Sequence, residues 1–163
     1  MEWDGRESSG IFVGNPIGWL LRNVNSSLAL FKDNGIRSFS KVLIAIRPGR
    51  RNKRFIDVAD KICRHFGASL TLLNIVSESD SNQKIKRTEK SSSELISETK
   101  SKSVVKIIKS NSPVEAISEE SASYDLLILG TPEKDNWISV LFGAGEDRFV
   151  KKAACSVLRL TIK

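Results

Sequence analysis

The amino-acid sequence alternates short apolar runs with longer segments whose apolar residues recur every three or four positions. One apolar run, Leu126–Leu129, stops at Gly130. A run of this length that ends at a turn residue is typical of a strand buried on both faces of a sheet. Four further runs are predicted strands: Lys41–Ile46, Leu70–Val76, Val104–Ile108 and Ser156–Ile162. Their regular alternation with helices predicts an α/β fold with a doubly wound, mainly parallel, five-stranded sheet.

Helix signals separate the predicted strands. One apolar helix face is formed by Phe55, Val58, Ala59, Ile62 and Phe66. A weakly amphipathic helix is predicted over Glu89–Lys100, in a polar crossover whose serines are also candidates for phosphorylation. Ser112, Pro113 and Glu115 match a capping box with proline in the first turn, which predicts a helix start. A short charged helix, Glu146–Lys152, precedes the last predicted strand.

Composition narrows the classes of function. The 163 residues are 40% hydrophobic, which suits one globular domain, and the net charge of +7 favours an acidic partner or an ordinary basic surface. Cys63 and Cys155 match no metal-ligand spacing and His65 is the single histidine, so we expect no metal site and two small core cysteines. The sequence offers no catalytic constellation, so an enzyme is not expected. No apolar run is long enough to span a membrane.

The N-terminal segment resembles the C-terminal end of the same chain. Phe12–Gly14 aligns with Leu141–Gly143, and Leu28–Phe31 aligns with Val157–Leu160. A degenerate internal repeat or a chance similarity of short amphipathic segments explains this agreement. On the repeat interpretation, residues 1–35 are the final helix and strand of a preceding repeat, or a dimerisation arm, and residues 36–163 form the main domain.

Several predicted strands, in their order and spacing, resemble those of a known family. The segments concerned are Lys41–Ile46, Ala68–Val76, Tyr124–Gly130, and Leu141–Gly143 followed by Cys155–Leu158. Together, over about residues 39–163, they resemble the universal stress protein (UspA-like) family. The resemblance implies the adenine nucleotide alpha hydrolase-like fold. It also implies tandem repeats, which occur as free proteins and in cytoplasmic C-terminal tails of amino-acid permeases, cation–chloride cotransporters and sodium/proton antiporters.

The resemblance also implies a nucleotide pocket, which this sequence retains in part. In nucleotide-binding members an acidic residue ends the first strand, and glycines let the backbone approach the phosphates. The corresponding candidate site residues here are Ile46, Arg47, Pro48, Gly130, Thr131, Gly143, Ala144 and Gly145. Arg47 replaces the acidic residue, Glu133 occupies the second glycine position, and Ala144 lacks the hydroxyl of the usual Ser or Thr. These departures predict a degenerate pocket.

Three functions follow from these observations. The first is a non-catalytic regulatory domain without a cofactor, cytoplasmic or at the inner face of the membrane as part of a transporter. The alternative is an ATP- or AMP-binding stress protein with slow or no ATPase activity. The third is a module that binds anions or acidic lipid through the basic run, unless that run is only a solvated loop. Its basic residues are Arg47, Arg50, Arg51, Lys53 and Arg54.

The last predicted strand is the expected interaction surface. It would lie at the edge of the sheet, and exposed edges invite pairing with another strand. Leu28–Phe31 is available for this pairing, either within the chain or in a symmetric partner, so a homodimer or tandem-repeat pairing is expected. Nucleic acid is not an expected partner, because aromatic residues are not interleaved with the basic ones.

Overall fold

The computed structural model describes residues 25–46, 52–130 and 148–162. These residues form an α/β fold with one six-stranded sheet, in the order β1-β6-β5-β2-β3-β4. The strands are β1 (Leu28–Lys32), β2 (Lys41–Ala45), β3 (Ser69–Val76), β4 (Ser103–Lys109), β5 (Leu126–Gly130) and β6 (Ser156–Thr161). The helices are α2 (Asn52–Phe66), α3 (Asn82–Ile96), α4 (Pro113–Ser121) and α6 (Arg148–Lys152). The predicted fold class is therefore confirmed.

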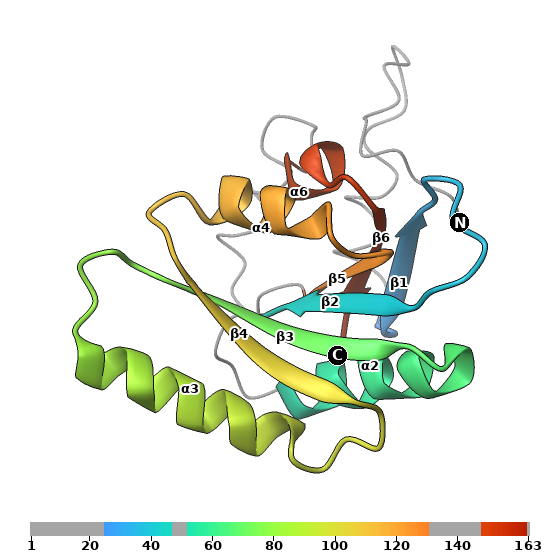
Figure 1. Ribbon diagram of the computed structural model, residues 1–163. Helices are drawn as coiled ribbons and strands as arrows, with labels where there is room; N and C mark the ends of the chain where they lie inside the picture. Colours follow the sequence, from blue (N-terminus) through green and yellow to red (C-terminus); the bar gives the residue numbers. More distant parts are fainter. Residues whose placement is uncertain (1–24, 47–51, 131–147, 163) are drawn as a thin grey trace.

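Helices cover both faces of the sheet. Figure 1 shows α4 and α6 on one face and α2 and α3 on the other. Alternate residues of the central strands therefore enter two different cores: Leu43 and Leu127 face α4 and α6, whereas Val42 and Ile128 face α2 and α3. Burial on both faces is the reason why these strands are continuous apolar runs in the sequence. Both cysteines are buried and free, as predicted.

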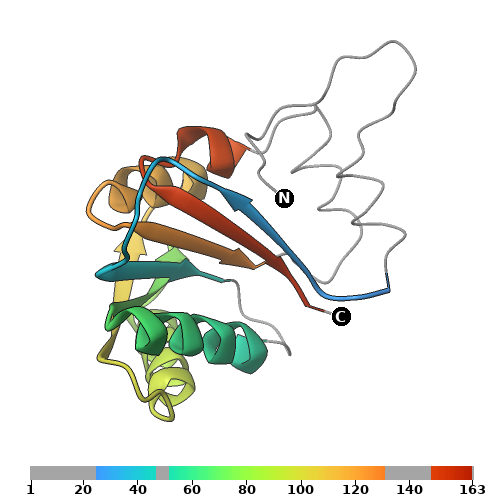
Figure 2. The same cartoon turned by 90° about the vertical axis from the view of Figure 1, so that its right-hand side faces the viewer.

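The sheet has six strands rather than the predicted five, because β1 pairs antiparallel with β6. Figure 2 shows the two strands side by side. Lys32, the last residue of β1, donates from Nζ to the Val150 carbonyl of α6 at 2.9 Å. Without β1, β6 would expose a row of unpaired backbone groups. Of the two pairings expected for Leu28–Phe31, the structure contains the one within the chain.

The segment after β1 is hydrogen-bonded to the start of β6. Asn34 donates from its backbone N–H to Ser156 Oγ and from Nδ2 to the Cys155 carbonyl, both at 2.9 Å. The segment then reaches β2, where Asp125 Oδ2 accepts from the backbone N–H groups of Ser40 and Lys41 at 2.7 and 2.9 Å. The connection between β1 and β2 is thus held at both ends by hydrogen bonds to distant parts of the chain.

Three helix predictions need correction. The helix expected from Glu89 begins at Asn82, because Ser81 caps it by accepting from the Lys84 N–H at 3.3 Å. The capping box at Ser112 is wrong, since the Ser112 side chain makes no capping hydrogen bond, although Pro113 does begin α4. Phe66 was expected on the buried face of α2 but is 41% exposed at the end of the helix.

Some predictions fall outside the described residues. These include the final helix of the expected preceding repeat, which would come before Leu28, the first two residues of the helix predicted at 146–152, and most of the basic run at 47–54. Of that helix, the structure describes α6, Arg148–Lys152. No helix within the described parts of the chain combines the length and apolar character needed to cross a membrane.

Candidate functional site

The sheet has one topological switch point, between β2 and β5. The chain proceeds from β2 to β3 and β4 on one side, and β5 and β6 lie on the other. Both β3 and β5 pair parallel with β2, and the described helices that follow β2 and β5, α2 and α6, lie on opposite faces of the sheet. In open α/β sheets, ligands bind in the crevice at this point. The carboxyl ends of β2 and β5 therefore form the candidate site.

Two of the candidate residues from the sequence meet at this switch point. Ile46 directly follows β2, and Gly130 is the last residue of β5. A Cβ atom at position 130 would lie 3.2 Å from Ile46 Cγ2, so the two residues are in direct contact. The other six candidates lie outside the described residues: Arg47, Pro48, Thr131, Gly143, Ala144 and Gly145.

Helix α2 packs against the same point. The Phe55 ring is 5% exposed, and its Cζ would lie 3.2 Å from a Cβ atom at position 130. This distance is shorter than most real Cβ contacts, so any side chain at Gly130 would displace Phe55 or Ile46. Packing of the protein alone therefore explains a glycine at this position, whether or not a phosphate approaches it.

Two polar residues near the switch point were missed by the sequence analysis. Asn52 begins α2 and is 9% exposed, and Arg159 of β6 is 2% exposed and lies opposite Leu129 of β5. Each residue lies at a position where the spacing of its apolar neighbours predicts a buried face. Asn52 lies three residues before Phe55 on the apolar helix face, and Arg159 lies on the same face of its strand as Val157. Burial of both residues depends on long-range packing, which the pattern alone does not reveal.

The basic run contributes two described residues, Lys53 and Arg54, at the start of α2. Lys53 donates from Nζ to Glu98 Oε2 at 2.6 Å across the surface between α2 and α3. This hydrogen bond and the opposite charge raise the pKa of Lys53 and lower the pKa of Glu98. Lys53 is thus engaged in a surface ion pair with the segment that follows α3.

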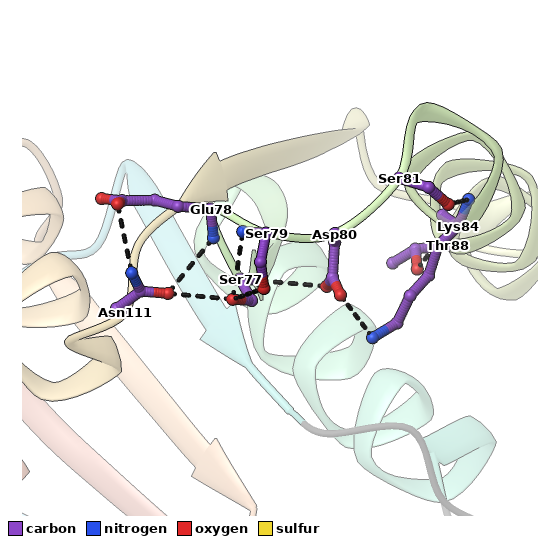
Figure 3. A network of polar contacts seen from close by, with 8 residues as sticks. All are labelled: Ser77, Glu78, Ser79, Asp80, Ser81, Lys84, Thr88 and Asn111. Atoms are coloured by element: carbon purple, nitrogen blue, oxygen red, sulfur yellow. Dashed lines mark hydrogen bonds and ion pairs between the residues drawn. The ribbon is translucent and has the colours of Figure 1, made fainter.

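A network of polar side chains lies next to the candidate site, at the carboxyl ends of β3 and β4, and joins the loops that follow these two strands (Figure 3). Asn111 accepts from Ser77 Oγ at 2.9 Å and donates from Nδ2 to Glu78 Oε2 at 3.1 Å. Asp80 accepts from the Ser77 N–H at 3.0 Å and from Lys84 Nζ at 2.6 Å. Because these groups satisfy one another, the network joins the two loops and adds no ligand-binding group to the site.

A buried carboxylate anchors the segment after α3 onto α2. Asp60 Oδ1 accepts from the Ser101 N–H, Ser101 Oγ and the Lys100 N–H at 2.9, 2.7 and 3.1 Å, and Arg64 Nε lies 3.2 Å from Oδ2. Burial alone would raise the pKa of Asp60, but these hydrogen bonds and the Arg64 charge outweigh it and lower the pKa. Asp60 is therefore a structural residue. The described residues contain no cluster of side chains suited to hold a metal ion.

Comparison with known proteins adds a family assignment. Residues 38–160 match the model of the universal stress protein family. A longer universal stress protein from Archaeoglobus fulgidus is 17% identical, with a TM-score of 0.67 over 91% of this chain and 54% of that one. A second one from Archaeoglobus fulgidus, in complex with dAMP, is 12% identical with a TM-score of 0.58, over 76% and 99% of the two chains. A family member from Arabidopsis thaliana with AMP bound is 16% identical, with a TM-score of 0.51 over 76% and 92%. No protein with a curated description matches the sequence.

Proposed function

Since this chain belongs to the universal stress protein family, we propose that it is a non-catalytic regulatory domain that binds an adenine mononucleotide. The site would be the crevice at the carboxyl ends of β2 and β5. The observation that carries this proposal is the contact between Ile46 and Gly130 at the switch point of the sheet. Related structures in complex with dAMP and with AMP support the choice of ligand class.

The sequence around the crevice favours a monophosphate over a triphosphate. Glu133 occupies the second glycine position of the phosphate-binding pattern, where its carboxylate would repel additional phosphate charge. Ala144 has no hydroxyl to donate to a phosphate oxygen. Each of these changes weakens binding of the outer phosphates more than binding of the nucleoside. AMP is therefore the expected ligand, and ATP the weaker one.

The thiols support the non-catalytic part of the proposal. Burial raises the pKa of Cys63 and of Cys155 to about 11, so both remain protonated at neutral pH and are poor nucleophiles. Cys63 belongs to the core under α2, and Cys155 belongs to the opposite core under α4 and α6. Neither thiol lies at the carboxyl ends of β2 and β5, where a nucleotide would bind.

Calorimetric titration of the purified chain with AMP and with ATP tests the proposal, with and without magnesium, at about 0.1 M salt to damp exposed charge attraction. We expect saturable AMP binding and weaker ATP binding. Glu133→Gln is expected to strengthen ATP binding several-fold with little effect on AMP, and Glu89→Gln on α3 is the matched charge-removal control. Absence of saturable AMP binding up to millimolar concentration would overturn the proposal.

The arrangement of β1 supports a second proposal, on the context of the domain. Strand β1 lies outside the residues that match the family model, yet it completes the sheet through β6. The longer Archaeoglobus protein aligns with 91% of this chain, whereas the protein bound to dAMP aligns with 76%. We propose that residues 1–35 are the end of a preceding repeat, and that the pair of repeats forms the regulatory tail of a membrane transporter. A homodimer is the alternative arrangement.

Transcript sequencing tests this second proposal. The transcript is expected to continue upstream of Met1 into a complete repeat and then into apolar segments long enough to span a membrane. An upstream stop codon in the same reading frame would exclude the transporter context. Light scattering of the purified chain would distinguish the alternative, since a concentration-dependent dimer favours pairing between two copies.

A further inference from the structure

Helix α3 carries an excess of basic residues that helix stability does not explain. Between Asn82 and Ser93 it holds one acidic residue, Glu89, and four basic ones: Lys84, Lys86, Arg87 and Lys90. Cations stabilise a helix near its C-terminus, yet the last turn of α3 contains none. Lys86 and Lys90 lie four positions apart, so their like charges repel one another across one turn. The basic residues are therefore candidates for binding something outside the chain.

Three of these side chains share one exposed face of the helix, the α3 basic face: Lys86, Arg87 and Lys90. An α-helix rotates by about 100° per residue, so the three lie within an arc of about 100°. Ser92, the buried residue of α3, and Ile96, which packs against the core, lie on the opposite side. Figure 1 shows α3 at the margin of the fold, beside the edge strand β4. The α3 basic face is therefore turned away from the sheet and toward solvent.

The α3 basic face retains its charge. Lys84, at its flank, forms an ion pair with Asp80 at 2.6 Å. The side chains of the face itself form no ion pair with any residue that the structure describes, including the acidic residues of the same helix, Glu89 and Glu94. Three unpaired cations thus lie together on a chain whose net charge is +7. Such a surface attracts an anionic partner, and the attraction weakens as the salt concentration rises.

We propose that the α3 basic face binds the surface of an anionic lipid bilayer. A bilayer presents many negative headgroups in one plane, so an exposed helix face can meet several of them without a pocket. Each Lys or Arg close to such a surface strengthens binding about fivefold, and three together strengthen it about 100-fold. This inference goes beyond the proposed function, because it needs no nucleotide and applies equally to a free protein and to a domain attached to a transporter.

The residues of α3 favour lipid over nucleic acid as the anionic partner. Proteins that bind single strands combine a basic groove with aromatic side chains on which the bases stack. Helix α3 contains no aromatic residue, and its three free cations lie on the outside of a helix. The attraction of the face is thus directed at headgroup charge, with nothing on α3 to stack on a base.

Sedimentation of the purified chain with lipid vesicles tests this inference, using phosphatidylcholine with about one third phosphatidylglycerol at about 0.1 M salt. Glutamine keeps the helix propensity and removes the charge, so the test variant combines Lys86→Gln, Arg87→Gln and Lys90→Gln. It is expected to bind the vesicles about 100-fold more weakly than wild type. The matched control has the same net charge and alters exposed lysines elsewhere: Lys41→Gln, Lys102→Gln and Lys109→Gln. Its binding should stay within about threefold of wild type.

The remaining outcomes separate the alternatives. Wild-type protein that does not sediment with these vesicles, or that sediments equally with pure phosphatidylcholine, would overturn the inference. Equal weakening in both triple variants would overturn it too, since net charge alone would then explain binding. Tighter binding to a DNA oligonucleotide, lost in the test variant, would assign the face to nucleic acid instead. Circular dichroism should show unchanged helix content in the test variant, and its AMP binding should equal that of wild type, so failure here is distinct from failure of the proposed function.

Discussion

Leu30 of β1 lies directly opposite Arg159 of β6 in an antiparallel pair, although the two residues are near opposite ends of the chain. Leu30 is 4% exposed and belongs to the core under α4 and α6. The strand outside the family match is thus part of the hydrophobic core as well as a cover for the sheet edge.

The first prediction concerns this pair. Leu30→Asp would bury a charge in the core and is expected to lower the free energy of unfolding by about 3 kcal/mol. Ala29→Asp is the matched control, because Ala29 lies on the same strand but is exposed, and it should change the stability little. Urea denaturation of both variants gives the comparison. Equal stability of the two variants would show that β1 is not packed as described.

The second prediction concerns Gly130. Gly130→Ala would place a Cβ atom 3.2 Å from Ile46 Cγ2 and from Phe55 Cζ, so we expect a loss of about 1–2 kcal/mol in the free energy of unfolding. Phe55→Leu makes room at this contact, so the double variant should be more stable than the two single losses predict. Thermal or urea denaturation of the four proteins measures the coupling. Strictly additive losses would contradict the contact.

The third prediction concerns acid stability. Because the pKa of Asp60 is lowered in the folded protein, its carboxylate stabilises the fold above the ordinary value of 3.8, and this contribution is lost as the pH falls through the folded-state pKa. Asp60→Asn is expected to be less stable at neutral pH and to lose less stability on acidification. Asp57→Asn, on the exposed face of the same helix, is the control. Urea denaturation between about pH 2 and 7 measures both effects; parallel curves for the Asp60 variant and wild type would refute the linkage.

The fourth prediction concerns the buried thiols. Burial raises the pKa of Cys63 and Cys155 from 9.0 to about 11, so the folded protein keeps two protons that the unfolded chain releases. Stability is therefore fully present below pH 9 and is expected to fall between about pH 9 and 11. Cys63→Ala with Cys155→Ala should flatten this part of the profile. A thiol reagent at pH 8 should react slowly with native protein and rapidly after denaturation; fast labelling of native protein would disprove the burial.

The fold was predictable wherever burial on both faces leaves a continuous apolar run. Leu126–Leu129 illustrates this, since β5 is buried along these residues and ends at Gly130 as expected. The pairing of β1 could not be predicted, because Leu28–Phe31 had two candidate partners and the sequence does not choose between them. That choice depends on a pairing between distant strands, which local patterns do not encode.

Caps and site residues were harder to predict for physical reasons. Several serines precede α3, and only the local geometry selects Ser81 as the cap. Ser112 matches a capping pattern, but with φ −119° and ψ 77° its hydroxyl makes no capping bond. At the candidate site, Ile46 and Gly130 were found from strand ends. The burial of Asn52 was missed because it arises from tertiary packing, while its residue type alone suggests a surface position.

The pairing of β1 with β6 has a consequence for biosynthesis. Of the described strands, β1 leaves the ribosome first, and its partner β6 leaves last. The apolar side chains of β1 therefore stay exposed to water, or bound by a chaperone, until almost the entire domain has been translated. Stalling the ribosome before β6 emerges should leave β1 open to proteases in the nascent chain. We therefore expect the pairing of β1 with β6 to be a late step of folding.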